Sequence, residues 1–446
     1  MGNLLKKLKN NELLYGSIIN FSIKLLSFIL TYFMMYLIIT NFGIEVYGKY
    51  NLYLTFIGVL SVIITFGGDI IFLKEISVLN TKTERVSIFR NISIVIFANS
   101  LIVCSLFIVL SLVPKVKNYF DGNAMNIYLI LFLSILVALT SIFVSGLRGT
   151  SKILIYSLSE RFLLRFFMSI SLLIGILLFL GIETIMLFAY VITTIVIMFL
   201  FKKYVFTEAY IIEDKTLAKY KPQTTKRVID VYRQARHILL SSLLILLISR
   251  TDTFFLSIFS NLETVGLYNA ILQVSLLINF AMSSINGILS PMISRGYASK
   301  DFVTLEGTLR LANKIIIGSS LITGLLLIVL IKPLFLLLDL KIDIILLATF
   351  IILIIGQIIC GSMGSVVNLL NMSGHFKQVS IATFLSFLIN IVFCLILIPS
   401  FGLIGAAIST SIGIISRDII STIYGFKLFG FKFSNYDFRK NKSNEK

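Results

Sequence analysis

An arginine and an aspartate lie two residues apart inside an apolar run, at Arg250 and Asp252 in 243-LLILLISRTDTFFLSIF-259. The run is long enough to cross a bilayer as a helix, and a charge at the bilayer centre costs about 2.5 to 3.5 kcal/mol on insertion scales. On a regular helix, residues two apart are separated by about 200° and do not face each other. We therefore expect each charge to meet water, a partner on another helix or, for Arg250, an anionic ligand.

Further cations lie within or beside apolar runs, at different depths. At 1.5 Å per helical residue, Arg250 is roughly 20 Å and Lys24 roughly 12 Å from the basic end of its run. Arg165 and Lys314 lie only about three residues inside, which favours extension of their charges to the membrane interface. Arg148 sits at the rim of its run. These five cations are the candidate contacts for an anionic substrate.

Two carboxylates complete the set of candidate site residues. Asp69 follows a glycine pair in 66-FGGDI-70, which we expect to kink or thin the helix, and Asp252 lies deeper in its run. An ionisable residue within a membrane span is a functional candidate by default. We therefore treat Asp69 and Asp252 as candidates for ion coupling or for lining a cavity.

The remaining polar residues indicate no second kind of site. The three cysteines and two histidines are far apart and lack a metal-ligand spacing, so we expect no metal, no cofactor and no catalytic residue: Cys104, Cys360, Cys394, His237 and His375. Six side-chain amides also fall within apolar runs, and interhelical hydrogen bonding is the favoured role of each: Asn20, Asn279, Asn286, Gln357, Asn368 and Asn390.

The elements that must position these residues are membrane spans. The 446 residues are 57% hydrophobic and 13% charged, with a mean hydropathy of +0.99, whereas soluble domains are about 45–50% apolar and about a quarter charged. The apolar residues come in blocks of about twenty, the length that spans a bilayer. We predict an all-α polytopic membrane protein with twelve spans: 16–40, 49–72, 91–113, 126–147, 162–180, 184–201, 237–259, 266–290, 311–331, 343–370, 378–398 and 402–425.

The distribution of Lys and Arg orients these spans. Most basic residues, among them Arg417 counted with the tail, fall in segments on one side, which predicts that both termini are cytoplasmic. The net charge of +18 lies between spans, so it does not indicate a nucleic-acid partner. A long polar stretch divides six spans from six. The expected domains are two lobes, 1–201 and 237–425, a cytoplasmic linker, 202–236, and a basic tail, 426–446.

The two halves are related in sequence. The element 45-EVYGKYN-51 recurs as 263-ETVGLYN-269, and 149-GTSK-152 recurs as 374-GHFK-377, each at the corresponding place in its half. Two matches in register support an internal repeat. Corresponding spans run in the same direction, which predicts parallel repeats related by an axis along the membrane normal. Transporters built in this way bind substrate between their halves.

The deep charges are not repeated. Arg250 aligns with Tyr32 of the first half, and Asp252 aligns with Met34. An asymmetric set of charges suits an asymmetric ligand better than a symmetric scaffold.

Four segments carry a family resemblance: 42-FGIEVYGKYNL-52, 145-SGLRGTSK-152, 234-QARHILLSSLLILLISRTDTFFLSIFSNLETVGLYNAILQV-274 and 398-IPSFGLIGAAISTSIG-413. The third includes Asp252 and the V-G-x-Y from Val265 to Tyr268, and the fourth includes a proline, an aromatic–Gly pair and G-A-A. They resemble the polysaccharide-repeat flippases of the Wzx type, which share the MOP superfamily with the MATE multidrug exporters and the lipid II flippases.

The resemblance implies a fold, a cargo and a location. The implied fold is MATE-like, with two six-helix bundles around a central cavity and no fixed cofactor. The implied activity moves undecaprenyl-pyrophosphate-linked sugar repeats from the cytoplasmic to the periplasmic leaflet of the bacterial inner membrane, by alternating access. Its partners would be that lipid-linked glycan, the bilayer, a coupling ion (H⁺ or Na⁺) and a polysaccharide polymerase.

Other functions stay open at this point. A multidrug or cation antiporter of the same superfamily would be expected to cluster carboxylates, whereas the cations here match or exceed the acids. The balance of cations and acids in the spans does not distinguish a lipid II flippase from a sugar-repeat flippase. A membrane glycosyltransferase or polymerase would need an acid/base or metal constellation, and the sequence shows none, so we do not expect an enzyme. A scramblase or scaffold without active transport is a further alternative.

Overall fold

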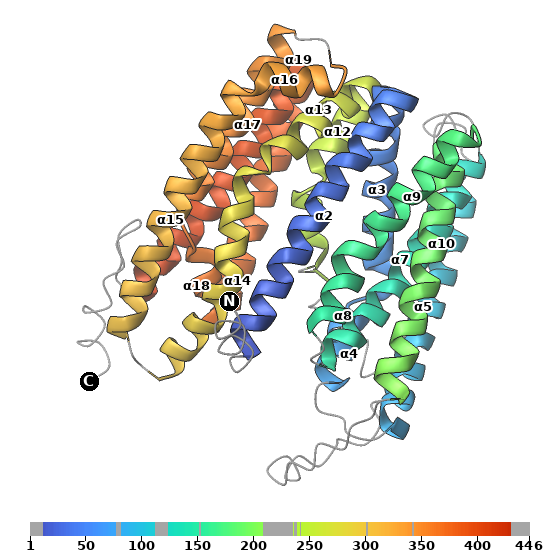
Figure 1. The fold of residues 1–446 in the computed structure, drawn as a ribbon, viewed down its shortest axis with the longest axis horizontal. Helices are drawn as coiled ribbons and strands as arrows, with labels where there is room; N and C mark the ends of the chain where they lie inside the picture. The colour runs from blue at the N-terminus through green and yellow to red at the C-terminus, as the bar shows by residue number, and fades with distance from the viewer. Residues whose placement is uncertain are drawn as a thin grey trace, which may run out of the picture. The chain divides into compact units, whose positions relative to one another are not determined.

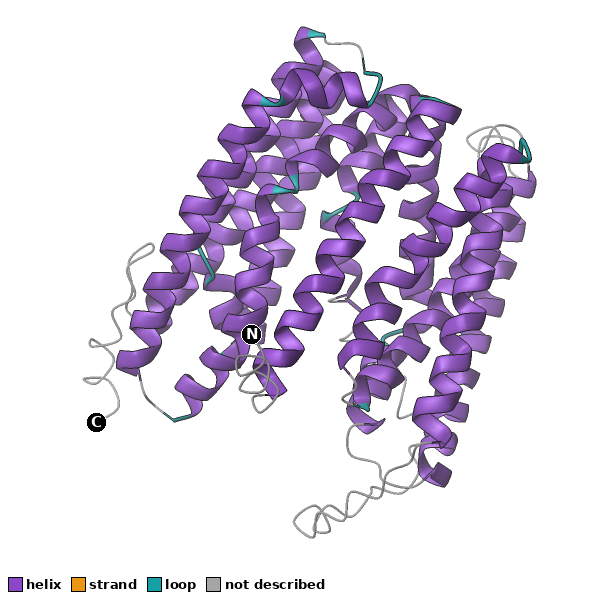
Figure 2. Cartoon of the chain, in the orientation of Figure 1, coloured by secondary structure: helices purple, strands orange, loops and turns teal. Residues whose placement is uncertain are grey.

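Every regular element in the described part of the chain is a helix, which confirms the all-α prediction (Figures 1 and 2). The computed structural model forms two compact units, the first from Met1–Asn41 and Tyr53–Leu246, the second from Phe42–Leu52 and Leu247–Lys446. The residues that the structure describes are 12–76, 82–111, 124–150, 153–207, 235, 239–240, 242–299, 302–340 and 343–429.

The helices of the first half run in order from α2 to a short π-helical segment, η2. They are α2 (Glu12–Phe42), α3 (Ile44–Thr65), α4 (Gly68–Ile76), α5 (Lys82–Ser111), α7 (Ala124–Gly149), α8 (Ile153–Ser157), the π-helical η1 (Leu158–Phe162), α9 (Leu163–Leu177), α10 (Ile182–Phe201) and η2 (Lys202–Thr207). In the first unit α10 packs against α7 and α9, and α4 packs against α5 and α7. Most of the predicted linker, 202–236, lies outside the described residues.

The second half begins at the helix Ser242–Ile248 and continues through eight further helices. They are α12 (Thr251–Phe259), α13 (Leu262–Ser275), α14 (Ile278–Ala298), α15 (Phe302–Val329), α16 (Ile331–Leu337), α17 (Ile344–Ser362), α18 (Val366–Met372) and α19 (Phe376–Phe429). In the second unit α19 packs against α12, α17 and α18, and α15 packs against α14 and α17. The tail beyond Phe429 lies outside the described residues.

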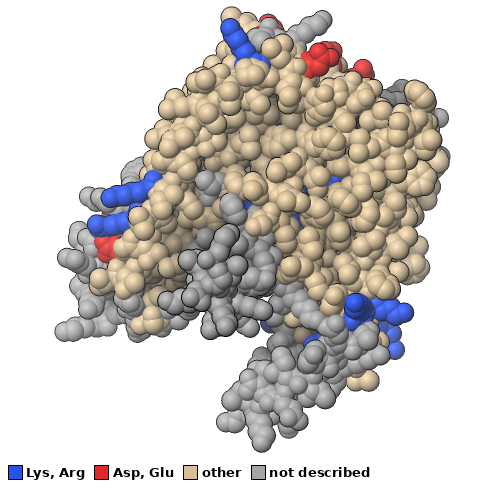
Figure 3. Space-filling view, viewed as in Figure 1, with Lys and Arg blue, Asp and Glu red and all other residues tan. Residues whose placement is uncertain are grey.

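Each predicted span coincides with a helix or with a helix broken once. Eight helices are long and apolar enough to cross a membrane, and ten if each of two bent pairs forms one span. Two further spans follow from the geometry. Within α19, Gly402 has φ 52° and ψ −119°, which is not helical and separates two spans, and α8, η1 and α9 follow one another without a gap. On the face shown in Figure 3, the charged side chains lie mostly near helix ends, beside a broad uncharged surface.

Four of the spans are broken within their length, and the sequence predicted only one of these breaks. The expected kink before Asp69 is confirmed, because α3 ends at Thr65 and both Phe66 (φ 50°) and Gly67 (φ 72°) have left-handed backbone. The breaks before α12, between α13 and α14, and between α17 and α18 were not predicted. The first of these invalidates the regular-helix geometry assumed above for Arg250 and Asp252.

The two copies of the repeated E-x-x-G-x-Y-N element pack directly against each other in the second unit. A Cβ on Gly48 of α3 would overlap the carbonyl oxygen of Leu262 and lie 2.8 Å from the Gly266 nitrogen. A Cβ on Gly266 of α13 would overlap the carbonyl oxygen of Ile44 and lie 3.0 Å from the Gly48 nitrogen. The reciprocal contact explains the glycine in each copy, since only glycine lets two helix backbones approach so closely.

Replacing Gly266 by alanine is therefore expected to be strongly destabilising. The added methyl group meets backbone, which cannot rotate away, so we expect a cost of about 3 kcal/mol or more, at or above the upper end of overpacking effects. The measurement is the thermal midpoint and the yield of monodisperse protein in detergent. Gly318→Ala on α15 is the matched control, since its Cβ would meet nothing within 4 Å. Equal midpoints for the two variants would contradict the contact.

A second glycine explains the motif that opens the last span. A Cβ on Gly405 would overlap the Leu397 carbonyl and lie 2.9 Å from the Ile398 nitrogen. Gly405 thus lets the final helix fold back closely on the end of the preceding one, while Ala406 and Ala407 are fully buried beside it. The G-A-A signature is a packing element.

Candidate functional site

Arg250 lies at the break of the seventh span. The helix Ser242–Ile248 and α12 are bent by 52°, and Arg250, with φ −133° and ψ −6°, is the residue that precedes the first turn of α12. Its side chain is half-buried and, among the described residues, has no ion-pair or hydrogen-bond partner. Discontinuous helices of this kind form substrate and ion sites in secondary transporters.

Asp252, in the first turn of α12, is buried and accepts three hydrogen bonds. The Tyr268 hydroxyl donates to Oδ2 at 2.5 Å, the Thr410 hydroxyl donates to the same oxygen at 2.9 Å, and the Thr253 amide donates to Oδ1 at 2.7 Å. These donors tie α12 to α13 and α19. In the described chain the carboxylate is thus held by neutral donors and forms no ion pair with Arg250.

The repeat element supplies part of this network. Tyr268 and Asn269 are the tyrosine and asparagine of 263-ETVGLYN-269, and the Thr253 hydroxyl donates to Asn269 Oδ1 at 3.2 Å. The residue of the first half that aligns with Asp252 is the buried, apolar Met34. The carboxylate that Tyr268 contacts is therefore not repeated at the aligned position of the first half, which agrees with the asymmetry seen in the sequence.

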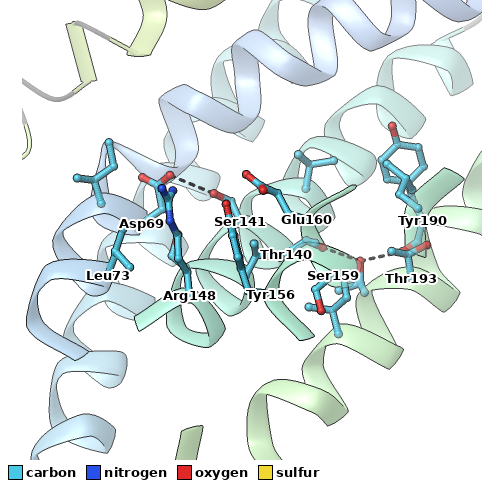
Figure 4. Close-up of a pocket in the computed structure, with 17 residues that line it drawn as sticks. Asp69, Leu73, Thr140, Ser141, Arg148, Tyr156, Ser159, Glu160, Tyr190 and Thr193 are labelled. Carbon is cyan, nitrogen blue, oxygen red and sulfur yellow. Dashed lines mark hydrogen bonds between the residues drawn. The ribbon is translucent and has the colours of Figure 1, made fainter. Parts of the chain in front are cut away.

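Asp69 and Arg148 line a cavity of about 320 Å³ inside the first unit. The Ser141 hydroxyl donates to Asp69 Oδ2 at 3.1 Å, and the Arg148 guanidinium lies over the Tyr156 ring, 5.2 Å from its centroid. Figure 4 shows these groups together with Glu160. Asp69 and Arg148 are separate candidates in the sequence, and the cavity that both of them line was not predicted.

The first unit also gathers three cations beside this cavity. Lys24 on α2 lies within electrostatic range of the Arg161 guanidinium, and Arg165 on α9 donates to the backbone carbonyl of Arg161. Arg161 in turn lies 3.4 Å from a carboxylate oxygen of Glu160, which lines the cavity. Lys24 and Arg165, two of the candidate cations, are thus brought together around a third that the sequence placed at the rim.

Lys314 lies apart from these groups, in the second unit. Its exposed side chain is on α15, between the exposed Leu311 (62%) and Ile315 (51%). A cation on such an apolar surface can reach the interface by extending along it. The placement favours the snorkelling role over a contact with substrate.

A buried ion pair in the last span was missed by sequence reasoning. Asp418 Oδ1 accepts from the Nε of Arg417 at 2.9 Å, and its Oδ2 accepts from the Cys360 thiol at 2.8 Å. Assigning Arg417 to the tail was wrong, because it lies within α19 and within the predicted span 402–425. Adjacent opposite charges inside an apolar run were the signal that was available.

Removing one partner of this pair is expected to cost more than removing both. Arg417→Gln leaves the Asp418 side chain, 4% exposed, without its cation, and Asp418→Asn leaves the arginine without its anion; breaking a fully buried pair costs about 3–5 kcal/mol, and we expect less here because Arg417 is 31% exposed. The double variant Arg417→Gln/Asp418→Asn is expected to lose less than the sum of the single losses. Thermal unfolding of the four proteins forms the cycle, and strict additivity would contradict the pair.

Hydrogen bonds between spans are confirmed for five of the six amides. Asn279 donates to Gln357 at 2.5 Å, Ser365 donates to Asn286 at 2.6 Å, and Ser290 donates to Asn368 at 2.9 Å. In the same unit, Asn390 donates to the carbonyl of Ser409 at 3.0 Å. The Asn20 side chain lies outside the described residues. Among those that are described, no three His, Cys, Asp or Glu side chains gather as a metal site.

The fold is that of solved MATE transporters. An inward-facing multidrug resistance MATE transporter of the MOP superfamily is 16% identical, with a TM-score of 0.67 over 92% of this chain and 97% of its own. An outward-facing one is 14% identical, with a TM-score of 0.63 over 93% and 94%. A MATE transporter from Vibrio cholerae is 15% identical, with a TM-score of 0.61 over 95% and 99%. No curated protein matches the chain.

Two family models match the sequence. The model described as MatE matches residues 238–396, and the model described as polysaccharide biosynthesis protein matches residues 13–297, more than half of the chain. Together with the fold, they identify a multi-pass transporter of the MOP superfamily and confirm the resemblance to its sugar-repeat flippases. The chain belongs to the polysaccharide biosynthesis protein family.

Proposed function

We propose that the protein is a flippase that moves undecaprenyl-pyrophosphate-linked oligosaccharide repeats from the cytoplasmic to the outer leaflet by alternating access. The observation that carries the proposal is Arg250, a guanidinium at the break of a membrane span without an ion-pair partner among the described residues. A charge costs several kcal/mol at such depth. An anionic ligand such as a diphosphate accounts for its presence.

The cation cluster of the first unit supports the same cargo. Lys24 lies within electrostatic range of the like-charged Arg161, Arg165 donates to the backbone carbonyl of Arg161, and Arg161 lies beside the Glu160 carboxylate. Guanidinium groups bind phosphate oxygens in a bidentate manner and ammonium groups bind them as point charges. These three side chains are therefore of the types that bind a diphosphate.

Export of cationic drugs is the second candidate, favoured by the MatE match over 238–396. Binding of a cationic drug fits the surroundings of the buried carboxylates Asp252 and Asp418 less well than binding of an anionic cargo fits Arg250. Asp252 is occupied by three neutral donors and Asp418 is paired with Arg417. A cationic substrate would have to displace these partners, whereas Arg250 has no ion-pair partner among the described residues. A lipid II flippase remains an alternative that charge does not separate.

Other parts of the proposal concern coupling, location and assembly. Asp252 and Asp69 are the proposed carboxylates for coupling to an H⁺ or Na⁺ gradient. The proposed location is the bacterial inner membrane with cytoplasmic termini, two lobes at 1–201 and 237–425, the linker 202–236 and the tail 426–446. A polysaccharide polymerase is the proposed protein partner.

Ligand-induced stabilisation tests the cargo class. Purified protein is heated with undecaprenyl diphosphate, undecaprenyl monophosphate or a cationic dye such as rhodamine 6G. We expect the diphosphate to raise the thermal midpoint most, since a bound ligand at about 100 times its Kd stabilises by about 2.7 kcal/mol. Stabilisation by the dye and not by the diphosphate would reject the flippase in favour of the drug exporter.

A further inference from the structure

The cavity of the first unit, which we call the first-unit pocket, combines an apolar wall with many hydroxyl and charged side chains. Eleven of its seventeen lining residues carry a hydroxyl or a charge, contributed by α4, α7, α8, η1 and α10, among them Asp69, Arg148, Tyr156, Ser159 and Glu160. In a membrane protein, a cavity lined by so many polar groups indicates a space that is filled by water or by a ligand. Its volume of about 320 Å³ exceeds the space of a single bound ion and lies at the lower end of small-molecule sites.

One buried hydroxyl in the pocket has no partner. Ser159, 3% exposed, has an oxygen without any hydrogen bond among the described residues. The nearby Thr193 and Thr194, by contrast, donate to carbonyls of their own helix at 2.6 and 2.8 Å. A buried polar group without a partner costs free energy. Ser159 therefore marks a position where a ligand can complete the hydrogen bonding.

A π-helical segment brings Ser159 and Glu160 to the pocket. Both lie in η1 (Leu158–Phe162), where the helix widens into a π-helical turn between α8 and α9. Such short π segments inside α-helices occur frequently at functional sites. In Figure 4 Ser159 and Glu160 lie between the Asp69–Arg148 side and the Tyr190–Thr193 side.

The charged side chains that line the first-unit pocket indicate which class of ligand it can bind. Asp69 and Glu160 both line the pocket, against one guanidinium, Arg148, which already covers the Tyr156 ring. Two carboxylates disfavour a diphosphate, and the Tyr156 ring already has the Arg148 guanidinium over it. A neutral polyhydroxylated ring offers donors to the carboxylates and acceptors to the guanidinium and the serine hydroxyl. The cation cluster adjoins the pocket at Glu160, so a diphosphate there would place the attached sugar beside the pocket.

We infer that the first-unit pocket holds one sugar ring of the lipid-linked cargo, and that Ser159 and Glu160 set which sugar is accepted. The inference rests on the proposed function. It places glycan selection inside one unit and separates it from the recognition of the diphosphate by cations.

The test compares cargo with and without sugar. Full-length protein in nanodiscs is titrated with undecaprenyl diphosphate, bare or carrying one sugar: glucose, galactose, N-acetylglucosamine or N-acetylgalactosamine. We expect at least one sugar to tighten binding about tenfold, the equivalent of one or two hydrogen bonds. In Ser159→Val and Glu160→Gln that gain is lost. Binding of the bare lipid is unchanged in Ser159→Val and is equal or tighter in Glu160→Gln, which removes the carboxylate beside Arg161.

Ser169→Ala is the matched control for the serine variant. Ser169 is also a buried hydroxyl in the first unit, but it donates to the carbonyl of Arg165 and does not line the pocket. Thermal midpoints of all variants separate loss of the sugar contact from misfolding.

The outcomes distinguish the inference from the proposed function. If the wild-type protein binds the bare diphosphate lipid and no sugar tightens that binding, the pocket does not hold a sugar. The proposed flippase function would be unaffected. An unchanged sugar gain in both pocket variants would lead to the same conclusion. A Na⁺ or pH dependence that Glu160→Gln removes equally for bare and sugar-bearing lipid would assign the pocket to a coupling ion. Failure of the wild type to bind any of the lipids overturns both.

Discussion

Replacing Arg250 by glutamine is expected to reduce transport of a prenyl-diphosphate cargo by roughly two orders of magnitude, since truncating one partner of a buried charge pair costs about 2–5 kcal/mol. Arg250 has no intramolecular ion-pair partner among the described residues, and the buried Asp252 carboxylate, which it influences electrostatically, keeps its three hydrogen-bond donors when Arg250 is replaced. The protein should therefore insert and fold at near wild-type yield. Arg250→Lys restores the charge without the planar fork and is expected to give intermediate transport.

Arg310→Gln is the matched control. Arg310 is also an arginine of the second unit, but it is paired with Glu306 at 2.5 Å near the start of α15 and is largely exposed. Exposed pairs of this kind contribute about 0–1 kcal/mol, so transport should stay near the wild-type rate. Equal losses in the Arg250 and Arg310 variants, or normal transport by Arg250→Gln, would remove Arg250 from the site.

Replacing Asp252 by asparagine is expected to abolish the dependence of transport on an ion gradient. The amide keeps the size of the carboxylate and can still accept from Tyr268 or Thr410, but it can neither bind a proton at physiological pH nor hold a cation by charge. We expect accumulation against a gradient to fall by at least about tenfold, the effect of losing about 1.4 kcal/mol of coupling. The measurement is uptake into vesicles with imposed H⁺ or Na⁺ gradients.

Two companion variants separate coupling from architecture. Tyr268→Phe removes the 2.5 Å donor and leaves the carboxylate, so we expect a loss of stability of about 1–3 kcal/mol, as for a charged group that loses a hydrogen bond, with gradient dependence retained. Asp252→Ala leaves three donors without their acceptor and is expected to be the least stable. Retained gradient dependence in Asp252→Asn would limit Asp252 to holding α12 against α13 and α19.

The positions of the spans could be predicted from sequence because they depend on local composition. A block of about twenty apolar residues has few alternatives to a membrane helix. The breaks are different. A glycine pair in the sequence predicts the break at Phe66–Gly67. No local feature predicts the break at Ser249–Arg250, because neither residue is a helix breaker. That break depends on what α12 packs against, including the bonds from Tyr268 and Thr410 to Asp252.

The site was predicted in part for the same reason. Charges in apolar runs stand out in a sequence, and Arg250, Asp252, Lys24 and Asp69 were found in this way. Hydroxyls do not stand out, because serine and threonine are common in membrane helices and bond to their own backbone. The first-unit pocket depends on hydroxyls from several helices and on a π-helical turn. Only the three-dimensional structure brings them together.

The measurement that tests the account most directly is transbilayer movement of a defined cargo in proteoliposomes. Fluorescent undecaprenyl-diphosphate saccharide is incorporated in both leaflets, and its appearance at the outer face is followed with an impermeant quencher. We predict movement that requires the protein, that free undecaprenyl diphosphate inhibits by competition and that Arg250→Gln slows by the roughly two orders of magnitude expected for a loss of about 2–5 kcal/mol, without transport of rhodamine 6G. Transport of the cationic dye with no movement of the diphosphate-linked lipid would contradict the account.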